Sequence, residues 1–442
     1  MSLFDGKRLD ADVFKLDIER ARDGWYSDKY FVNIAELLDA LAEDDYRLAT
    51  PGGRVRVGHI QVEMQFFTRR KPFSIVAGTD KALAILKLCS GRRGPRGEWV
   101  PAWPELDVEA VQDGETIEYD GDPLHVTPVL RVRGRYRDFA VLETPILGCL
   151  TRCTRIATNV FRAVSAADGK EVLFFPARFD AHEVQASDGY SYQIGVQAYN
   201  HWARKQVPPR VSTDAQGDWW GADGGGTIAH AAIACFMGDV VEAMLCFART
   251  RPPSIPRIAL VDFTNDCVGE TLRLMRVMFR EWAARTAEGD SEGAARYRLA
   301  AVRADTASSM RDVSVEPLGD PALDNGVCPR LIDNMRAAID SAHRSWDIPD
   351  AWRAWAPDWC RSVRIVATGG FTPEKIATFE QQGVPVDIYG VGSSLLWSHE
   401  CDGSVSDYTA DVVRVRVGAE WTAMAKVGRR ACDNPRLERV EP

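Results

Sequence analysis

The sequence predicts an α/β protein in which an antiparallel domain is joined to an α/β barrel or a doubly wound sheet. Its length and two patterns of hydrophobicity predict this class. The chain has 442 residues, of which 45% are hydrophobic, so it can bury a large core spread over two or three domains. Apolar and polar residues alternate before residue 140, whereas later apolar runs are short, continuous and separated by helical patterns.

The first 140 residues have the pattern of half-exposed antiparallel strands. Segments such as "RVRVGHIQVEMQFFTRR" and "ETIEYDGDPLHVTPVLRVRGRY" alternate in polarity, with Gly, Pro and Asp between them. One helix interrupts the strands, because Thr79 can cap the segment "DKALAILKLC". We therefore expect an antiparallel α+β domain over residues 1–140.

Residues 141–397 have the pattern of repeated βα units. The runs "RIALVDFT", "LAAVRADT", "VRIVATGG" and "VDIYGVG" are typical of parallel strands that are covered on both faces. A helix between the last two is predicted from Thr372 as its cap, Pro373 as its first residue and Gly383 at its end. Upstream, residues 206–226 form a long turn-rich segment, which is either a lid or a disordered surface excursion.

Glycines at the ends of the last two strands predict a phosphate site. Gly369 and Gly370 follow one strand, and Gly390 and Gly392 follow the next, with Ser393 behind them. Carboxyl ends of consecutive parallel strands meet on one face, and glycine lets an anion approach the backbone N–H groups there. The alternative is that these glycines only form turns.

A strand end earlier in the chain carries a charged pair. Arg303 and Asp305 are two residues apart, so both point to the same side of their strand, and Thr306 follows them. The guanidinium could bind phosphate or carboxylate, and the Asp305 carboxylate could bind ribose hydroxyls or a metal. The alternative is an internal ion pair between the two side chains.

A histidine opens an apolar helix after a glycine run. In "GGGTIAHAAIACF", Thr227 precedes His230, which falls in the first helical turn, where backbone N–H groups attract anions. His230 could therefore donate a proton or accept a phosphate. The alternative is a packed core histidine.

Composition excludes several classes of function. The net charge of −9 is dispersed along the chain, which argues against a nucleic-acid partner. No stretch of about 20 residues is apolar enough to span a membrane, so a cytoplasmic protein is expected. The ten cysteines have no zinc-binding spacing and are expected to be reduced thiols. We therefore predict no metal site formed by protein ligands.

Seven motifs in their order resemble the nicotinate phosphoribosyltransferase family and its nicotinamide and quinolinate relatives. They are "WYSDKYFVNIAELL", "VRGRYRDFAVLETPILGCLTRCTRIATN", "GTIAH", "IALVDFTND", "VRADTASSMRD", "ATGGFTPEKI" and "VDIYGVGSSL". The resemblance implies the type II phosphoribosyltransferase fold: an irregular α/β barrel over residues 141–397 and an antiparallel α+β domain over residues 1–140, completed by residues 398–442. It also implies a homodimer with shared active sites.

The implied activity joins nicotinate and phosphoribosyl pyrophosphate to give nicotinate mononucleotide and pyrophosphate in NAD biosynthesis, with Mg²⁺ on the pyrophosphate and ATP as co-substrate. By resemblance, Tyr30 stacks on the pyridine ring with Asp28 as its companion, both from the neighbouring subunit. Arg303 and Asp305 hold the phosphoribosyl group, and His230 takes phosphate from ATP. The remaining implied substrate contacts are Thr227, Thr306, Gly369, Gly370, Gly390, Gly392 and Ser393. Arg178, in "FFPARFDAH", is our candidate for the pyridine carboxylate contact.

The sequence departs from the family pattern around that arginine. Pro176 stands where the family has glycine, Phe179 follows Arg178 where a second basic residue is frequent, and Ala231 follows His230. An alternative is therefore an altered or silent paralogue that binds phosphoribosyl pyrophosphate or another aromatic acid. A Schiff-base aldolase would need a lysine at a strand end, which the predicted strands lack, and a barrel dehydrogenase would use Cys267 as its reactive thiol.

Overall fold

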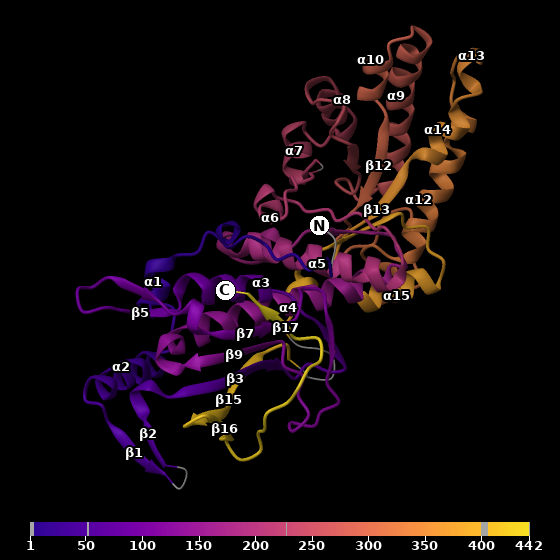
Figure 1. The fold of residues 1–442 in the computed structure, drawn as a ribbon. Helices are drawn as coiled ribbons and strands as arrows, with labels where there is room; N and C mark the ends of the chain where they lie inside the picture. Colours follow the sequence, from indigo (N-terminus) through magenta and orange to yellow (C-terminus); the bar gives the residue numbers. More distant parts are fainter. Residues whose placement is uncertain (1–3, 51–52, 227, 399–404, 442) are drawn as a thin grey trace. The chain divides into compact units, whose positions relative to one another are not determined.

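The computed structural model describes residues 4–50, 53–226, 228–398 and 405–441 (Figure 1). The chain forms two compact units, which we describe separately. Unit 1 comprises Met1–Phe161, Ala186–Lys205 and Leu396–Pro442, and unit 2 comprises Arg162–Gln185 and Gln206–Leu395.

Unit 1 is built on a six-stranded antiparallel sheet in the order β16-β15-β3-β9-β7-β17. Its strands are β3 (Gln61–Thr68), β7 (Asp107–Ala110), β9 (Leu130–Arg135), β15 (Tyr408–Val417), β16 (Glu420–Ala423) and β17 (Glu438–Val440). Strand β15 pairs with β3, and β17 pairs with β7, so the sheet combines segments that are far apart in the sequence (Figure 1).

Three two-stranded ribbons and several helices surround this sheet. The ribbons pair β1 (Arg47–Thr50) with β2 (Gly53–Arg56), β4 (Phe73–Ile75) with β8 (Thr116–Glu118), and β5 (Gly91–Arg93) with β6 (Trp99–Pro101). The helices are α1 (Ile18–Arg22), α2 (Lys29–Glu43), α3 (Thr79–Cys89), α4 (Glu143–Ala166) and α5 (Gln185–Ala203).

One face of the sheet forms the core of unit 1. Alternate residues of β3, among them Val62 and Phe66, pack with Leu86 of α3 and with Ile146 and Leu150 of α4. The first half of α4 therefore belongs to unit 1. This position differs from the boundary expected at residue 140, because the apolar side chains of α4 complete the core of the antiparallel sheet.

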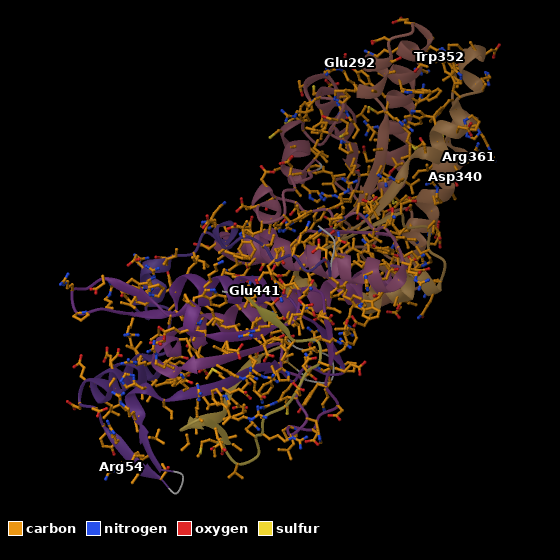
Figure 2. The ribbon with its side chains drawn as sticks, in the orientation of Figure 1. Arg54, Glu292, Asp340, Trp352, Arg361 and Glu441 are labelled. Carbon is orange, nitrogen blue, oxygen red and sulfur yellow. The ribbon has the colours of Figure 1, made fainter. Side chains whose placement is uncertain are left out.

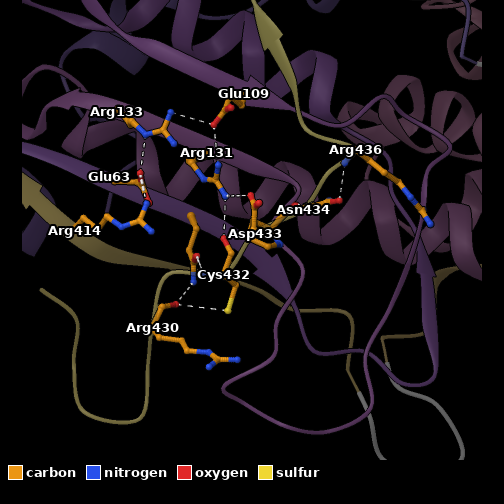
Figure 3. Close-up of polar contacts among 12 residues, drawn as sticks. Glu63, Glu109, Arg131, Arg133, Arg414, Arg430, Cys432, Asp433, Asn434 and Arg436 are labelled. Carbon is orange, nitrogen blue, oxygen red and sulfur yellow. Dashed lines mark hydrogen bonds and ion pairs between the residues drawn. The ribbon is translucent and has the colours of Figure 1, made fainter. Parts of the chain in front are cut away.

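The other face of β3 is also buried, although alternation in the sequence predicted a half-exposed strand. Glu63 is only 1% exposed, and its two carboxylate oxygens accept hydrogen bonds from Nε of Arg133 at 2.7 Å and Nη1 of Arg414 at 2.8 Å (Figure 3). The Gln65 amide bonds to the backbone of Arg430 and Cys432, at 3.0 Å each. Charge pairing and the C-terminal segment thus cover a face that the residue types alone suggest is solvated.

The predicted cap of α3 is wrong by one residue. Gly78, with φ of 94°, is the N-cap, and Thr79 is the first helical residue. The Thr79 hydroxyl instead donates to the Asp113 carboxylate at 2.6 Å. Asp113 also accepts a hydrogen bond from the Thr79 amide at 2.8 Å, so a buried carboxylate from another segment satisfies the first N–H group of the helix.

Unit 2 contains a five-stranded parallel sheet in the order β10-β14-β13-β12-β11. Its strands are β10 (Glu171–Phe174), β11 (Arg257–Leu260), β12 (Leu299–Ala304), β13 (Arg364–Ala367) and β14 (Ile388–Val391). A parallel bridge between Phe174 and Val211 extends it beyond β10. The prediction of four buried parallel strands is confirmed, and β10 is a fifth that the sequence analysis missed.

Helices connect the strands of unit 2. They are α6 (Asp214–Gly217), α7 (His230–Cys235), α8 (Val240–Thr250), α9 (Cys267–Ala287), α10 (Ser291–Arg296), α11 (Pro321–Asp324), α12 (Pro329–Ser341), α13 (Asp350–Arg353), α14 (Ala356–Ser362) and α15 (Pro373–Gln381). The charged side chains of Glu292, Asp340 and Arg361 point outward from α10, α12 and α14 (Figure 2). The mixed α/β class predicted from the sequence is confirmed.

The buried Arg257 fixes the start of β11. Its guanidinium donates to the backbone carbonyl oxygens of Arg296 at 2.8 Å and of Pro252 and Arg251 at 2.7 Å each. The guanidinium thus ties the ends of α8 and α10 to this strand. Burial lowers the pKa of Arg257, and the carbonyl dipoles offset part of the cost of burying its charge.

None of the described helices combines the length and the hydropathy that a membrane span requires. The nine cysteines within the described residues are all free thiols.

Candidate active site

A cavity of about 410 Å³ lies in unit 2 at the carboxyl ends of four parallel strands. Residues at the ends of β12 and β14 and directly after β10, β12, β13 and β14 line it, together with residues from 212–230. Nine residues predicted from the sequence are brought together there: Arg178, His230, Arg303, Asp305, Gly369, Gly370, Gly390, Gly392 and Ser393. Ligands of parallel α/β sheets bind at this edge, so the position fits a substrate site.

Arg303 presents a positive charge with unused hydrogen-bond donors to the cavity. Among the described residues its guanidinium donates only to the backbone oxygen of Ile228 at 3.5 Å, and the buried Nε atom has no partner. Burial lowers the pKa of Arg303, and the charge of Arg178 lowers it further, although Asp305 and Asp262 oppose both effects. A buried guanidinium with spare donors is a binding group for phosphate or carboxylate oxygens.

Asp305 is oriented by a neighbouring strand. The hydroxyl of Thr368, which follows β13, donates to Oδ1 of Asp305 at 2.7 Å, and the backbone oxygen of Ala304 lies 3.0 Å from the same hydroxyl oxygen. No ion pair joins Asp305 to Arg303 in the described chain, so the internal ion pair weighed from the sequence is not what the structure shows. The second carboxylate oxygen is therefore available to a ligand in the cavity.

The four glycines play two different structural roles. Gly369 and Gly370 have φ of 95° and 67°, a left-handed conformation that favours glycine. A Cβ atom on Gly390 would lie 2.4 Å from Cγ2 of Thr368, and one on Gly392 would lie 2.7 Å from the ring of Phe179. The first pair is required by the backbone, whereas the second pair makes room for neighbouring side chains.

The helix predicted between β13 and β14 is confirmed. Thr372 caps α15 by accepting a hydrogen bond from the Lys375 amide at 3.2 Å, and Pro373 is the first helical residue. Gly383 follows the helix with φ of 68°. The cap places the N-terminus of α15 directly after Gly369 and Gly370, where its free N–H groups favour an anion.

His230 begins α7 and is paired with an aspartate. Its Nε2 atom lies 3.0 Å from Oδ2 of Asp262, and its side chain is 47% exposed, so it is not a packed core histidine. Burial raises the pKa of Asp262, although the hydrogen bond from His230 opposes the rise. Asp262 thus fixes the orientation of the imidazole and can stabilise a positive charge on it.

The loop after β10 supplies Arg178 and two aromatic rings. Pro176 precedes the short 3-10 turn η6 (Ala177–Phe179), which closes with a hydrogen bond from the Phe179 amide to the Pro176 oxygen at 2.8 Å. Proline at position 176, where the sequence analysis expected glycine, is therefore compatible with this turn. The Arg178 guanidinium lies 5.3 Å from the centre of the Phe179 ring and is exposed, so it is available to an anionic group.

Sequence analysis missed several residues of this site. Asp262 could have been found from "VDFTND", where an acid directly follows a buried strand. Phe175 and Phe179 line the cavity after β10, the strand that the sequence analysis missed, and Thr368 follows β13. The pairing of Asp262 with His230 joins residues 32 positions apart and has no local signal.

Thr306, another predicted residue of unit 2, does not line the cavity. Thr306 is 3% exposed and faces the thiol of Cys267 at 3.6 Å, with burial raising the pKa of that thiol. Thr227 lies outside the described residues. The segment 206–226 is folded in the structure: Thr213 and Gln216 form a capping box around α6.

Tyr30 and Asp28 belong to unit 1, where they form a separate cluster. The Tyr30 hydroxyl donates to Oδ2 of Asp28 at 2.9 Å, and the Tyr30 side chain is 62% exposed. Thr144 in the first turn of α4 accepts a hydrogen bond from the Asp28 amide at 3.1 Å and donates to Oδ2 of Asp28 at 3.3 Å. Thr144 therefore binds both the backbone amide and the side-chain carboxylate of Asp28.

Glu143 precedes Thr144 and is a buried carboxyl group. The Tyr136 hydroxyl donates to it at 3.4 Å. Burial raises the pKa of Glu143 to about 8, and the nearby charges of Asp411 and Asp28 raise it as well. At neutral pH most Glu143 side chains therefore carry a proton.

Comparison with known proteins gives consistent matches. Residues 44–154 match the family model described as quinolinate phosphoribosyl transferase, N-terminal domain. The chain is 25% identical to nicotinate phosphoribosyltransferase of Bos taurus over 400 residues, which cover 80% of this chain and 68% of the relative. It is also 25% identical to the Homo sapiens enzyme of that name, over 66% of this chain, and spans about half of that relative (52%).

The fold has a counterpart among solved structures. The crystal structure of nicotinate-nucleotide pyrophosphorylase from Pyrococcus furiosus aligns with a TM-score of 0.62 and 23% sequence identity. The alignment covers 96% of this chain and 85% of that structure. Both sheets of the chain thus fall within one known architecture.

Proposed function

Because the chain belongs to the nicotinate phosphoribosyltransferase family, we propose that it transfers a phosphoribosyl group from phosphoribosyl pyrophosphate to nicotinate in NAD biosynthesis. The products would be nicotinate mononucleotide and pyrophosphate. One observation carries the proposal: Arg303, Asp305 and four glycines meet at the strand ends around a single cavity. These groups fit a ligand that has a phosphate, two ribose hydroxyls and a second anionic group.

The residues match the charge that develops in this reaction. Displacement of pyrophosphate from C1 of ribose builds positive charge on the sugar and negative charge on the leaving group. Asp305, oriented by Thr368, would bind the ribose hydroxyls on the positive side, and Arg303 would bind phosphate oxygens. The pyridine nitrogen is already a nucleophile, so the protein needs to orient the ring rather than remove a proton from it.

Orientation of the ring is assigned to aromatic and cationic groups. Arg178 would bind the pyridine carboxylate, and the Phe175 and Phe179 rings give the same part of the cavity apolar walls. Tyr30 is assigned to stack on the ring from a second copy of the chain, since its side chain is exposed in unit 1. We therefore propose a homodimer with shared active sites.

ATP and Mg²⁺ are the proposed co-reactants. His230 would accept a phosphate from ATP, supported by its exposure and by Asp262, which orients the ring. Mg²⁺ would neutralise charge on the leaving pyrophosphate. Asp305 is the residue suited to it, because it lines the cavity and, in the described chain, only its Oδ1 atom is engaged, by Thr368.

A cytoplasmic location is also part of the proposal. Its support is the chemistry of the cysteines, since all nine in the described chain are free thiols, as expected in a reducing compartment.

A second candidate is a paralogue that uses another aromatic acid. The observation that favours it is the loop at Pro176, where Phe179 packs against Gly392 and lines the cavity in place of a second basic side chain. A base pocket with more aromatic surface and less positive charge would favour an aromatic acid that is more apolar than nicotinate.

The test measures pyrophosphate release with phosphoribosyl pyrophosphate and Mg²⁺, with nicotinate, nicotinamide or quinolinate supplied separately, each with and without ATP. Release with nicotinate that ATP increases would support the proposal, provided that the Asp305→Asn variant loses it. No pyrophosphate release with any of the three bases, together with thermal stabilisation of the protein by phosphoribosyl pyrophosphate, would favour the paralogue. Absence of both activity and stabilisation would refute both candidates.

A further inference from the structure

A second cavity, of about 610 Å³, lies entirely within unit 1 and takes no part in the proposed reaction. Its walls come from β4, β8, α4, α5 and residues 433–436 near the C-terminus. Its size falls in the range of small-molecule sites. We propose that this cavity binds an organic cation that carries an aromatic ring, such as an aromatic quaternary ammonium or a pyridinium compound.

Three aromatic side chains form the apolar part of the cavity. Phe73 and Phe161 meet edge to face, with ring centroids 5.7 Å apart. Trp202 of α5 also lines the cavity and is 56% exposed, which is high for a tryptophan. Aromatic faces attract positive charge as well as apolar surface, so such walls favour an aromatic cation over a neutral molecule of the same size.

The carboxylate of Glu118 selects for positive charge. Glu118 lies directly opposite Phe73 in the β4–β8 ribbon, so the two side chains are neighbours on the cavity wall. Within the described residues Glu118 has no ion-pair partner, although it sits beside the cavity. A cation on the face of the Phe73 ring would therefore also contact a carboxylate.

The other charged groups of the cavity already have partners. Arg436 donates through Nη1 to Glu115 at 2.8 Å and to the backbone oxygen of Thr116 at 2.6 Å. Asp433 accepts from Nη2 of Arg131 at 3.0 Å (Figure 3). With both groups paired, the unpaired charge of Glu118 determines the preference of the cavity.

The experiment titrates the full chain with benzyltrimethylammonium by isothermal calorimetry at low salt, with benzyl alcohol and benzoate as neutral and anionic probes of similar size. We expect saturable binding of the cation, and binding of the other two probes that is weaker by roughly fivefold or more. Trp202→Ala and Glu118→Gln should each weaken binding of the cation by a similar factor. Both side chains are exposed, so circular dichroism should show a folded protein in each case.

Matched controls come from β16, where Glu420 and Trp421 are exposed and do not line the cavity. Glu420→Gln and Trp421→Ala should leave the affinity for benzyltrimethylammonium unchanged. The proposal is overturned by any of three results: no saturable binding to the wild type, benzoate binding as tightly as the cation, or unchanged affinity in the Trp202 and Glu118 variants.

Discussion

Replacement of Gly390 by alanine should destabilise unit 2 and change the orientation of the Asp305 side chain, although the new methyl group does not contact Asp305. The new Cβ atom would lie 2.4 Å from Cγ2 of Thr368 and 3.2 Å from the Phe175 ring. Carbon atoms pack at about 3.5–4.0 Å, so Thr368 would have to move by about 1 Å. Gly390 cannot retreat easily, because it is paired with Leu173 inside the parallel sheet.

The size of the effect follows from these contacts. Overpacking of a buried site costs about 1–3 kcal/mol, and each kcal/mol lowers the Tm of a domain of this size by about 2–4 °C. The Thr368 hydroxyl that orients Asp305 at 2.7 Å would move with its methyl group. A hydrogen bond to a charged group contributes about 1.5–3 kcal/mol, so loss of orientation should lower kcat/KM by about tenfold or more.

Differential scanning calorimetry and pyrophosphate release measure the two effects. Thr368→Ser provides the matched rescue, because serine keeps the hydroxyl and lacks the methyl group that clashes. The double variant Gly390→Ala/Thr368→Ser should regain most of the lost Tm and activity. If Gly390→Ala behaves as the wild type, or if Thr368→Ser restores nothing, the steric explanation is wrong.

Three further predictions concern the Asp28 cluster of unit 1, its neighbour Glu143, and the His230–Asp262 pair of unit 2. Thr144→Val should raise the KM for nicotinate several-fold with little change for phosphoribosyl pyrophosphate, because Asp28 loses two hydrogen bonds, and Thr144→Ser should restore it in steady-state assays. Asp262→Asn should abolish the stimulation by ATP while basal transfer persists, since a neutral amide stabilises a charged His230 less; equal stimulation would contradict this role. The pKa of Glu143 is about 8 in the folded chain, above its ordinary value of 4.5, so its contribution to stability is full below that ordinary value and is lost as the pH rises through 8. The Tm of Glu143→Gln should therefore depend less on pH between 5 and 9 than that of the wild type. Parallel plots of Tm against pH for the two proteins would show that burial does not raise the pKa of Glu143.

The strand ends of unit 2 could be predicted from the sequence because their signals are local. Continuous apolar runs identify four parallel strands, and the threonine, proline and glycine around α15 identify a helix with both its ends. Since residues directly after parallel strands share one edge of the sheet, the nearness of Arg303, Asp305 and the glycines followed without any knowledge of distance.

What could not be predicted depends on contacts between distant segments. Asp113 binds Thr79 at the start of α3, and Asp262 orients the imidazole of His230; the sequence around these residues signals neither pairing. The reason for glycine at 390 is likewise the methyl group of Thr368, which follows another strand. Local patterns place backbone elements, whereas the partner of each polar group emerges only when the elements pack.

The pairing of β15 with β3 has a consequence for how the protein is made. On the ribosome, residues 61–68 are synthesised about 340 residues before residues 408–417, their partners in the sheet. During that interval β3 has an open hydrogen-bonding edge beside an apolar face, a state prone to aggregation. Unit 2 is encoded between these two segments, so all of it is synthesised before β15 can complete the sheet of unit 1.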